Sequence, residues 1–219
     1  MNECAIRLEE QIISLFPRQE TEVYQGWIIK KEEDHLCVHP LYSYYPDHNI
    51  LQSIQRCETI SRQNGLDCMF RIAEYTNYHL ASVLTDYGYR LQQCCLIGEL
   101  QIDPQEIPVY LNDGDGALST ETVPCLDSLL IRQTDGEAVE RIVSPSDTVI
   151  GFRRQELLFI PDGDCLDGRM IKQLCCFSQI HGIRRIVVTI PGQEKLPEDY
   201  EKLGCHKAYL CRYYGKQEE

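Results

Sequence analysis

The sequence predicts an α/β protein with two similar halves, each a mixed, centrally parallel sheet flanked by helices. Three observations lead to this prediction. Segments with apolar residues at the spacing of one buried helix face alternate with short apolar runs typical of buried strands. A glycine stands near the end of each helical segment, where a left-handed residue often ends a helix. The helix–strand–helix–strand order, which favours a sheet that is parallel at its centre, occurs twice, and Gly88 and Gly204 show the shared offset of 116 residues.

The first copy covers residues 50–98. It begins with a helical segment at 50–61, preceded by Asn49, which is suited to cap it. The run "CMFRI" predicts a strand at 68–72, a second helix ends at "DYGY", and "RLQQCCLIG", residues 90–98, predicts the closing strand. These segments make one helix–strand–helix–strand unit.

The second copy covers residues 167–215 and follows an apolar run, "LLFI", that Pro161 ends. A helix begins near Met170, "RIVVTI" predicts a strand, a helix ends at "KLGC", and "KAYLCRYYG" predicts the last strand. The turn-rich segments "QIDPQEIP" and "LNDGDGALS" separate the copies. We therefore expect an N-terminal half over residues 1–103 and a C-terminal half over residues 104–219.

The composition is that of a folded, acidic protein. Of the 219 residues, 43% are hydrophobic, and the formal net charge is −13. This hydrophobic fraction does not indicate disorder. The negative charge argues against nucleic acid and against anionic lipid as partners, and it favours a small, cationic amine as a ligand. The sequence leaves open whether the chain forms a homo-oligomer.

The N-terminal segment "MNECAIRLEEQIISLF" is acidic and amphipathic, unlike a signal peptide. No apolar run approaches the ~20 residues of a membrane helix, so we expect a cytoplasmic protein. The twelve cysteines include no CxxC pair, and most lie in apolar runs. They are interpreted as reduced core residues.

The second copy resembles the C-terminal half of the GNAT superfamily, the acyl-CoA-dependent N-acyltransferases. The resemblance lies in "RMIKQLCCFSQIHGIRRIVVTI" and in "QEKLPEDYEKLGCHKAYLCRYY". In the second stretch, the family's Asn, Ala and Leu-Tyr positions read Gln193, Leu196 and Asp199–Tyr200. The first copy resembles the same fold through "FRI" and "LTDYGY". "GWIIKKEEDHLCVHPLYSYYP" with "CETISRQNGLDCMFRI" resembles a subgroup with two GNAT-like halves in one chain.

The resemblance implies a sheet splayed at its centre, with acetyl-CoA bound in the splay as a cosubstrate and a small amine as the acyl acceptor. It implies that the pyrophosphate meets backbone N–H groups at the start of the central helix, where the helix dipole favours an anion. Tyr200 matches the family's general acid, and Gln193 stands where the family often has an Asn near CoA. The positions that the resemblance assigns to acetyl-CoA binding are Phe159, Ile160, Asp162, Gly163, Asp164, Cys165, Asp167, Gly168, Arg169 and Gln193.

The loop in "IPDGDCLDGRMI", residues 160–171, departs from the family motif R/Q-x-x-G-x-G/A. Asp162 stands at the R/Q position, and Cys165 and Asp167 stand at the two glycine positions. Each carboxylate beside a pyrophosphate costs roughly 1 kcal/mol at surface dielectric, whereas the helix dipole recovers only about 0.3–1 kcal/mol. Asp167 is better suited to cap the helix. The family resemblance and the acidic charge favour an N-acetyltransferase acting on a small amine. The departure of this loop from the motif motivates the alternative, a non-catalytic GNAT-fold protein that binds a ligand or partner and has lost CoA binding.

Two further stretches are candidates for ligand binding. "HLCVH" places His35, Cys37 and His39 on one strand face, but ~7 Å separates successive same-face residues along a strand, so we expect no metal there. The acids of "DGDCLD" lack the spacing of a calcium-binding EF-hand. "YSYYPDH", residues 42–48, offers aromatics with Asp47 and His48, which line a substrate cleft or pack on a neighbouring domain.

Overall fold

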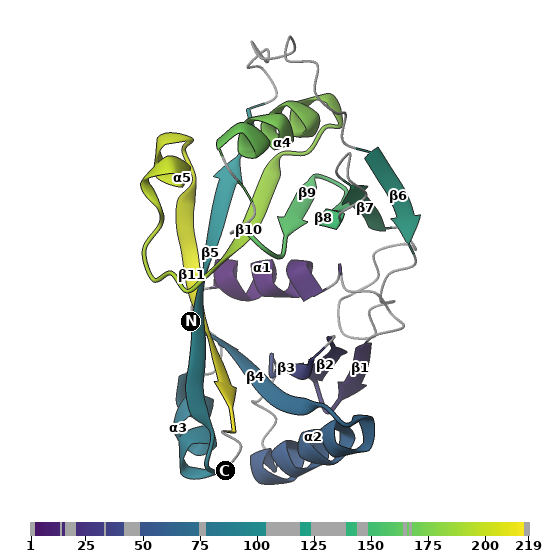
Figure 1. Cartoon of the computed structure of the whole chain (residues 1–219), viewed down its shortest axis with the longest axis vertical. Helices are drawn as coiled ribbons and strands as arrows, with labels where there is room; N and C mark the ends of the chain where they lie inside the picture. Colours follow the sequence, from purple (N-terminus) through teal and green to yellow (C-terminus); the bar gives the residue numbers. More distant parts are fainter. Residues whose placement is uncertain are drawn as a thin grey trace. The chain divides into compact units, whose positions relative to one another are not determined.

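The computed structural model describes residues 3–13, 15, 21–32, 34–41, 49–74, 78–103, 119–123, 139–143, 149–163, 166 and 168–216 (Figure 1). These residues form two compact units. The first contains the described residues up to 94 and from 209 onward, and the second contains those from 95 to 208. Among the residues described, no helix is both long and apolar enough to cross a membrane.

The first unit is a mixed sheet with helices packed on it. Its elements are α1 (Glu3–Ile13), β1 (Thr21–Tyr24), β2 (Trp27–Lys31), β3 (His35–His39), α2 (Ile50–Asn64), β4 (Asp67–Ala73), α3 (Tyr78–Asp86), the beginning of β5 (Arg90–Gln101) and most of β11 (His206–Gly215). The strand order is β1-β2-β3-β4-β11. The β3–β4 pair is parallel and the other pairs are antiparallel.

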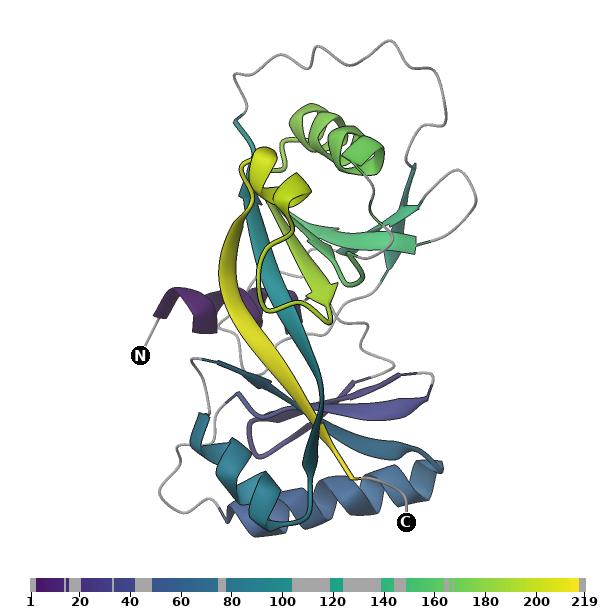
Figure 2. The same cartoon turned by 60° about the vertical axis from the view of Figure 1, so that its left-hand side comes forward.

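Helices α2 and α3 cover one face of this sheet (Figure 2). Alternate residues of β2, β3 and β4 point to that face, because side chains along a strand alternate between faces. Phe70 lies at the centre, edge-to-face with Trp27 at 5.8 Å and with Tyr89 at 5.1 Å between ring centroids. The helical periodicity at 50–61 is therefore explained by burial of Ile54, Cys57 and Ile60 against this cluster.

The caps of α2 are those that the sequence predicts. The Asn49 side chain accepts a hydrogen bond from the Gln52 N–H, and Gly65 ends the helix with φ 65°. Gly88, Gly182 and Gly204, near the ends of the other three helical segments, also have positive φ.

The second unit is also a mixed sheet. Its elements are the end of β5, β6 (Ser119–Val123), β7 (Val139–Val143), β8 (Val149–Arg154), β9 (Leu157–Ile160), α4 (Gly168–Ile180), β10 (Arg185–Pro191), α5 (Glu198–Lys202) and the start of β11. The strand order is β5-β10-β9-β8-β7-β6. The β9–β10 pair is parallel and the other pairs are antiparallel.

Both predicted helix–strand–helix–strand units are present, and each sheet has one parallel pair next to antiparallel ones. The predicted fold class is therefore confirmed. The predicted sequence repeat and the predicted boundary between residues 103 and 104 are not tested by this division into units. They stay predictions.

The two copies exchange their last strands. β5 follows α3 in the chain, yet its residues 95–101 pair with β10 of the second unit. β11 follows α5, yet its residues 211–215 pair with β4 of the first unit. Each compact unit is thus completed by a strand from the other copy.

Candidate functional site

The loop after β9 stays attached to β10. The parallel pairing ends with Ile160 beside Val188, and beyond it the Gly163 N–H donates to the Thr189 carbonyl at 2.7 Å. This bond holds the loop beside β10 at the position where the family resemblance implies a splay between the strands.

Tyr200 of α5 contacts the same loop. Its side chain is buried, and its hydroxyl donates to the Gly163 carbonyl at 2.8 Å. The Leu166 N–H donates to this same carbonyl at 3.0 Å. The structure therefore brings together two residues that the sequence assigned to the site separately, the candidate acid Tyr200 and the loop residue Gly163.

The loop approaches β10 so closely at position 163 that only glycine fits there. A Cβ atom at this position would lie 2.6 Å from Val188 Cγ2, 2.8 Å from the Thr189 carbonyl oxygen and 3.2 Å from the Tyr200 hydroxyl. Any side chain here would push the loop away from the strand. The geometry explains this glycine by packing against protein atoms.

Two N–H groups of the loop already have protein acceptors. Those of Gly163 and Leu166 donate to backbone carbonyls, whereas a phosphate-binding loop turns its N–H groups toward the ligand. Asp162 is exposed. The described part of the loop is thus closed on itself and on β10, and these two bonds must open before its N–H groups can meet a pyrophosphate.

Solved structures share this architecture, although no family model and no curated protein matches the chain. A GCN5-related N-acetyltransferase from Kribbella flavida aligns over 100% of this chain and 98% of its own, with 11% identity and a TM-score of 0.56. One from Sphaerobacter thermophilus aligns over 87% of this chain and 76% of its own, with 11% identity and a TM-score of 0.52. The chain has the fold of the GCN5-related N-acetyltransferases. A functionally unknown conserved protein from Staphylococcus epidermidis shares this GNAT fold over 97% of this chain and 98% of its own, at 10% identity and a TM-score of 0.52.

A small apolar space lies beside the loop in this GNAT fold. Its volume is about 20 Å³, and Leu166, Ile171, Val188 and Tyr200 contribute to its lining. A space of this size holds about one water molecule.

The other predicted binding residues are placed as follows. Phe159 and Ile160 are buried strand residues of β9, and Gln193 is exposed in the segment between β10 and α5. The backbone of Gly168 and Arg169 begins α4. Asp164, Cys165 and Asp167 lie outside the described residues, as does the aromatic stretch at 42–48 with Asp47 and His48.

The stretch "HLCVH" forms β3, with His35 at its start and His39 at its end. His39 is buried, and burial holds its pKa well below the usual range, so its ring is neutral. His35 and Cys37 approach Glu32, which precedes the turn between β2 and β3. Glu32 was not predicted from the sequence, because only the hairpin brings it opposite His35. The acids of "EEDH" beside a histidine were the available signal.

Proposed function

We propose that this chain is an acyl-CoA-dependent N-acetyltransferase acting on a small amine, with its acyl-donor site where β9, β10 and the loop at 161–167 meet. The observation that carries the proposal is the position of the Tyr200 hydroxyl, which reaches this loop at the carboxyl end of the parallel strand pair. Two structures with the same fold carry the description of N-acetyltransferases, and the net charge of −13 favours a cationic acceptor.

In this proposal Tyr200 is the general acid. Attack of the amine nitrogen on the thioester carbonyl forms a C–N bond and breaks the C–S bond. Water takes the proton that the amine nitrogen loses, the Tyr200 hydroxyl gives its proton to the departing thiolate, and the phenolate is reprotonated from solvent. To do so, the hydroxyl must leave the Gly163 carbonyl. The fit of acyl-CoA to the described residues therefore requires an opened loop.

The proposal is tested with acetyl-CoA and a panel of small amines. We expect heat of binding and a thermal shift with acetyl-CoA, and an acetylated amine detected by mass spectrometry. Tyr200→Phe should lower kcat at least tenfold and leave KM for acetyl-CoA nearly unchanged. Tyr214→Phe, at a half-buried tyrosine of β11 in the first unit, is the matched control. Absence of heat and of a thermal shift at millimolar acetyl-CoA would refute the proposal.

A charge reversal in the loop tests the same site. Asp162 stands at the family's R/Q position and is exposed, so Asp162→Arg replaces repulsion of a pyrophosphate by attraction. Removing the repulsion and adding the attraction should each contribute roughly 1 kcal/mol to the binding free energy, which together correspond to at least tenfold tighter binding of acetyl-CoA. Glu194→Arg, at an exposed acid outside the loop, should change the affinity much less. Equal effects of the two substitutions would place the cosubstrate elsewhere.

A second function, that of a non-catalytic GNAT-fold protein that binds a ligand or partner, is favoured by the closed loop. The N–H groups of Gly163 and Leu166 are bonded to carbonyls, and the loop sequence is rich in aspartate. Under this hypothesis Tyr200 serves only to hold the loop, and its hydrogen bond contributes about 0.5–1.5 kcal/mol. Acetylation of any amine in the panel, lost on Tyr200→Phe and kept in Tyr214→Phe, would rule it out.

A further inference from the structure

Three potential metal ligands converge where β2 turns into β3, in the first unit. The Glu32 N–H donates to the His35 carbonyl at 2.9 Å, which closes the turn. His35 and Cys37 lie on the same face of β3, because they are two residues apart on a strand. One ligand atom from each of Glu32, His35 and Cys37 lies within 4.8 Å of the others.

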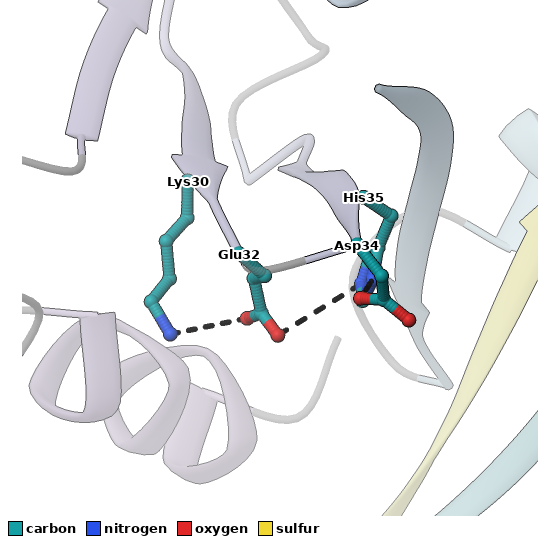
Figure 3. Close-up of polar contacts among 4 residues, drawn as sticks. All are labelled: Lys30, Glu32, Asp34 and His35. Atoms are coloured by element: carbon teal, nitrogen blue, oxygen red, sulfur yellow. Dashed lines mark hydrogen bonds and ion pairs between the residues drawn. The ribbon is translucent and has the colours of Figure 1, made fainter. Parts of the chain in front are cut away.

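The carboxylate of Asp34 orients the His35 ring (Figure 3). Asp34 Oδ1 lies 2.6 Å from His35 Nδ1. A carboxylate oxygen can only accept a hydrogen bond, so the Nδ1–H of His35 is the donor in this contact. The proton of a neutral ring therefore sits on Nδ1, which leaves the Nε2 lone pair 3.9 Å from Glu32 Oε2. Histidines that bind metals usually have this kind of carboxylate on their second nitrogen.

Lys30 holds the other oxygen of Glu32. Its Nζ lies 3.0 Å from Glu32 Oε1, as the dashed line in Figure 3 shows. The two carboxylate oxygens are thus divided, with Oε1 toward Lys30 and Oε2 toward His35. A cation at Oε2 leaves the Lys30 contact in place.

We propose that Glu32 Oε2, His35 Nε2 and Cys37 Sγ bind one zinc ion, with Asp34 and Lys30 as positioning residues. A mixed oxygen, nitrogen and sulfur set suits zinc. Metal–ligand bonds of about 2.0–2.3 Å in a tetrahedral site need ligand atoms about 3.3–3.7 Å apart, so side-chain shifts of about 1 Å complete it. The Cys37 thiol gives its proton to solvent as it binds, and water takes the fourth position.

This ligand set differs from the one that strand geometry excludes. The ~7 Å spacing along β3 refers to the backbone positions of successive same-face residues; the ligand atoms of His35 and Cys37 nevertheless come within 4.8 Å of each other, and His39, one same-face position further along, is not part of the set. Glu32 belongs to the neighbouring arm of the hairpin, so it approaches from the side. Cross-strand proximity makes the cluster compact.

The test uses the full chain, reduced and treated with a chelator, and titrated with Zn²⁺ against a chromophoric competitor. We expect one ion per chain. Co²⁺ in its place should give a thiolate-to-metal charge-transfer band in the near ultraviolet. Glu32→Gln, His35→Gln and Cys37→Ser should each weaken binding at least tenfold, and Asp34→Asn should weaken it about 10–100-fold. Cys68→Ser, at a partly buried cysteine outside the cluster, is the matched control and should leave binding unchanged.

Substitutions at Asp34, which is exposed, and at His35, which is partly buried, keep the test decisive if Cys37→Ser, at a buried site, fails to fold. The Asp34 side chain is 87% exposed and that of His35 is 17% exposed, so their substitutions spare the core. If His35→Gln and Asp34→Asn bind zinc as tightly as the unchanged chain, other thiols hold the ion. The proposal would then be wrong.

Discussion

Glu9 and Arg71 form an ion pair inside the first unit. Arg71 Nη1 lies 2.7 and 2.5 Å from the two carboxylate oxygens of Glu9, and the side chains are 5% and 1% exposed, respectively. The Cys211 thiol also donates to Glu9, at 3.4 Å. One buried carboxylate thus connects α1 with β4 and β11. A buried charge is tolerated only while its partner remains, because either ion alone is poorly solvated there.

Glu9→Gln is expected to lower the free energy of unfolding by about 3–5 kcal/mol, because it removes the negative charge that pairs with the buried Arg71 guanidinium. Urea denaturation measures the loss. The control is Glu198→Gln, which removes an exposed carboxylate 3.5 Å from Lys202 and should cost less than about 1 kcal/mol. Similar losses for the two substitutions would contradict the argument.

Three thiols that are buried or partly buried are expected to lower the stability of the chain in alkali. Burial raises the pKa of Cys68 from 9.0 to about 12, and that of Cys175 and of Cys205 from 9.0 to about 11. A raised folded-state pKa favours the protonated folded state, so its stabilisation is complete below pH 9 and is lost between pH 9 and 11–12. We expect urea denaturation to show a falling free energy of unfolding from pH 9 to 11, with a smaller fall in Cys205→Ala. An equal fall in Cys205→Ala would show that the Cys205 thiol does not contribute to the loss of stability.

Single residues were predictable from the sequence only where the signal was local or shared with a family. Tyr200 and Gly163 were both assigned to the site, but the bond between them joins residues 37 positions apart. Glu9 and Arg71 are 62 positions apart and carry no local signal, since a buried ion pair is visible only once the fold brings it together.

Among the elements, α2 has the clearest local signals. Asn49 caps its first turn through a 3.2 Å hydrogen bond from the Gln52 N–H. Asn49→Ala should cost about 1 kcal/mol, because that N–H loses its acceptor. Gln52→Ala keeps the backbone N–H at an exposed position and should change the stability by only a few tenths of a kcal/mol, in the stabilising direction, because alanine is the better helix former. Thermal unfolding of both variants checks the difference, and a cost of Gln52→Ala as large as that of Asn49→Ala would show that the cap contributes nothing.

Elements with long apolar periodicity were predicted well, and others were not. α4 begins at Gly168, two residues before the predicted start, and β4 and β10 exceed their predicted runs by one or two residues. β6, β7 and β8 were not predicted, because they lie outside the repeated pattern. The path of the loop after β9 depends on the Thr189 carbonyl of β10 and on the Tyr200 hydroxyl of α5. Neither contact can be predicted from the residues of the loop alone.

At the scale of the whole molecule, the exchanged strands make each unit depend on the other copy. A chain ending at residue 208 lacks the residues of β11 that pair with β4. We expect the β4 amides to lose protection in hydrogen exchange, while the β10 amides, paired with β5 and β9, keep more of theirs. A chain ending at 216 retains β11 and is the control. Equal protection of β4 in the two truncated chains would contradict this dependence.

The exchange also sets an order of events during synthesis. The ribosome produces most of the first unit early, but the strand that borders β4 emerges last. Until then β4 presents an unpaired edge, which is open to pairing with other chains. The second unit already has β5 when β10 emerges, so its central strands can pair first. The second unit should therefore complete its central sheet before the first unit does, although the first unit is synthesised earlier. The sheet of the first unit should be the one that most needs protection from aggregation.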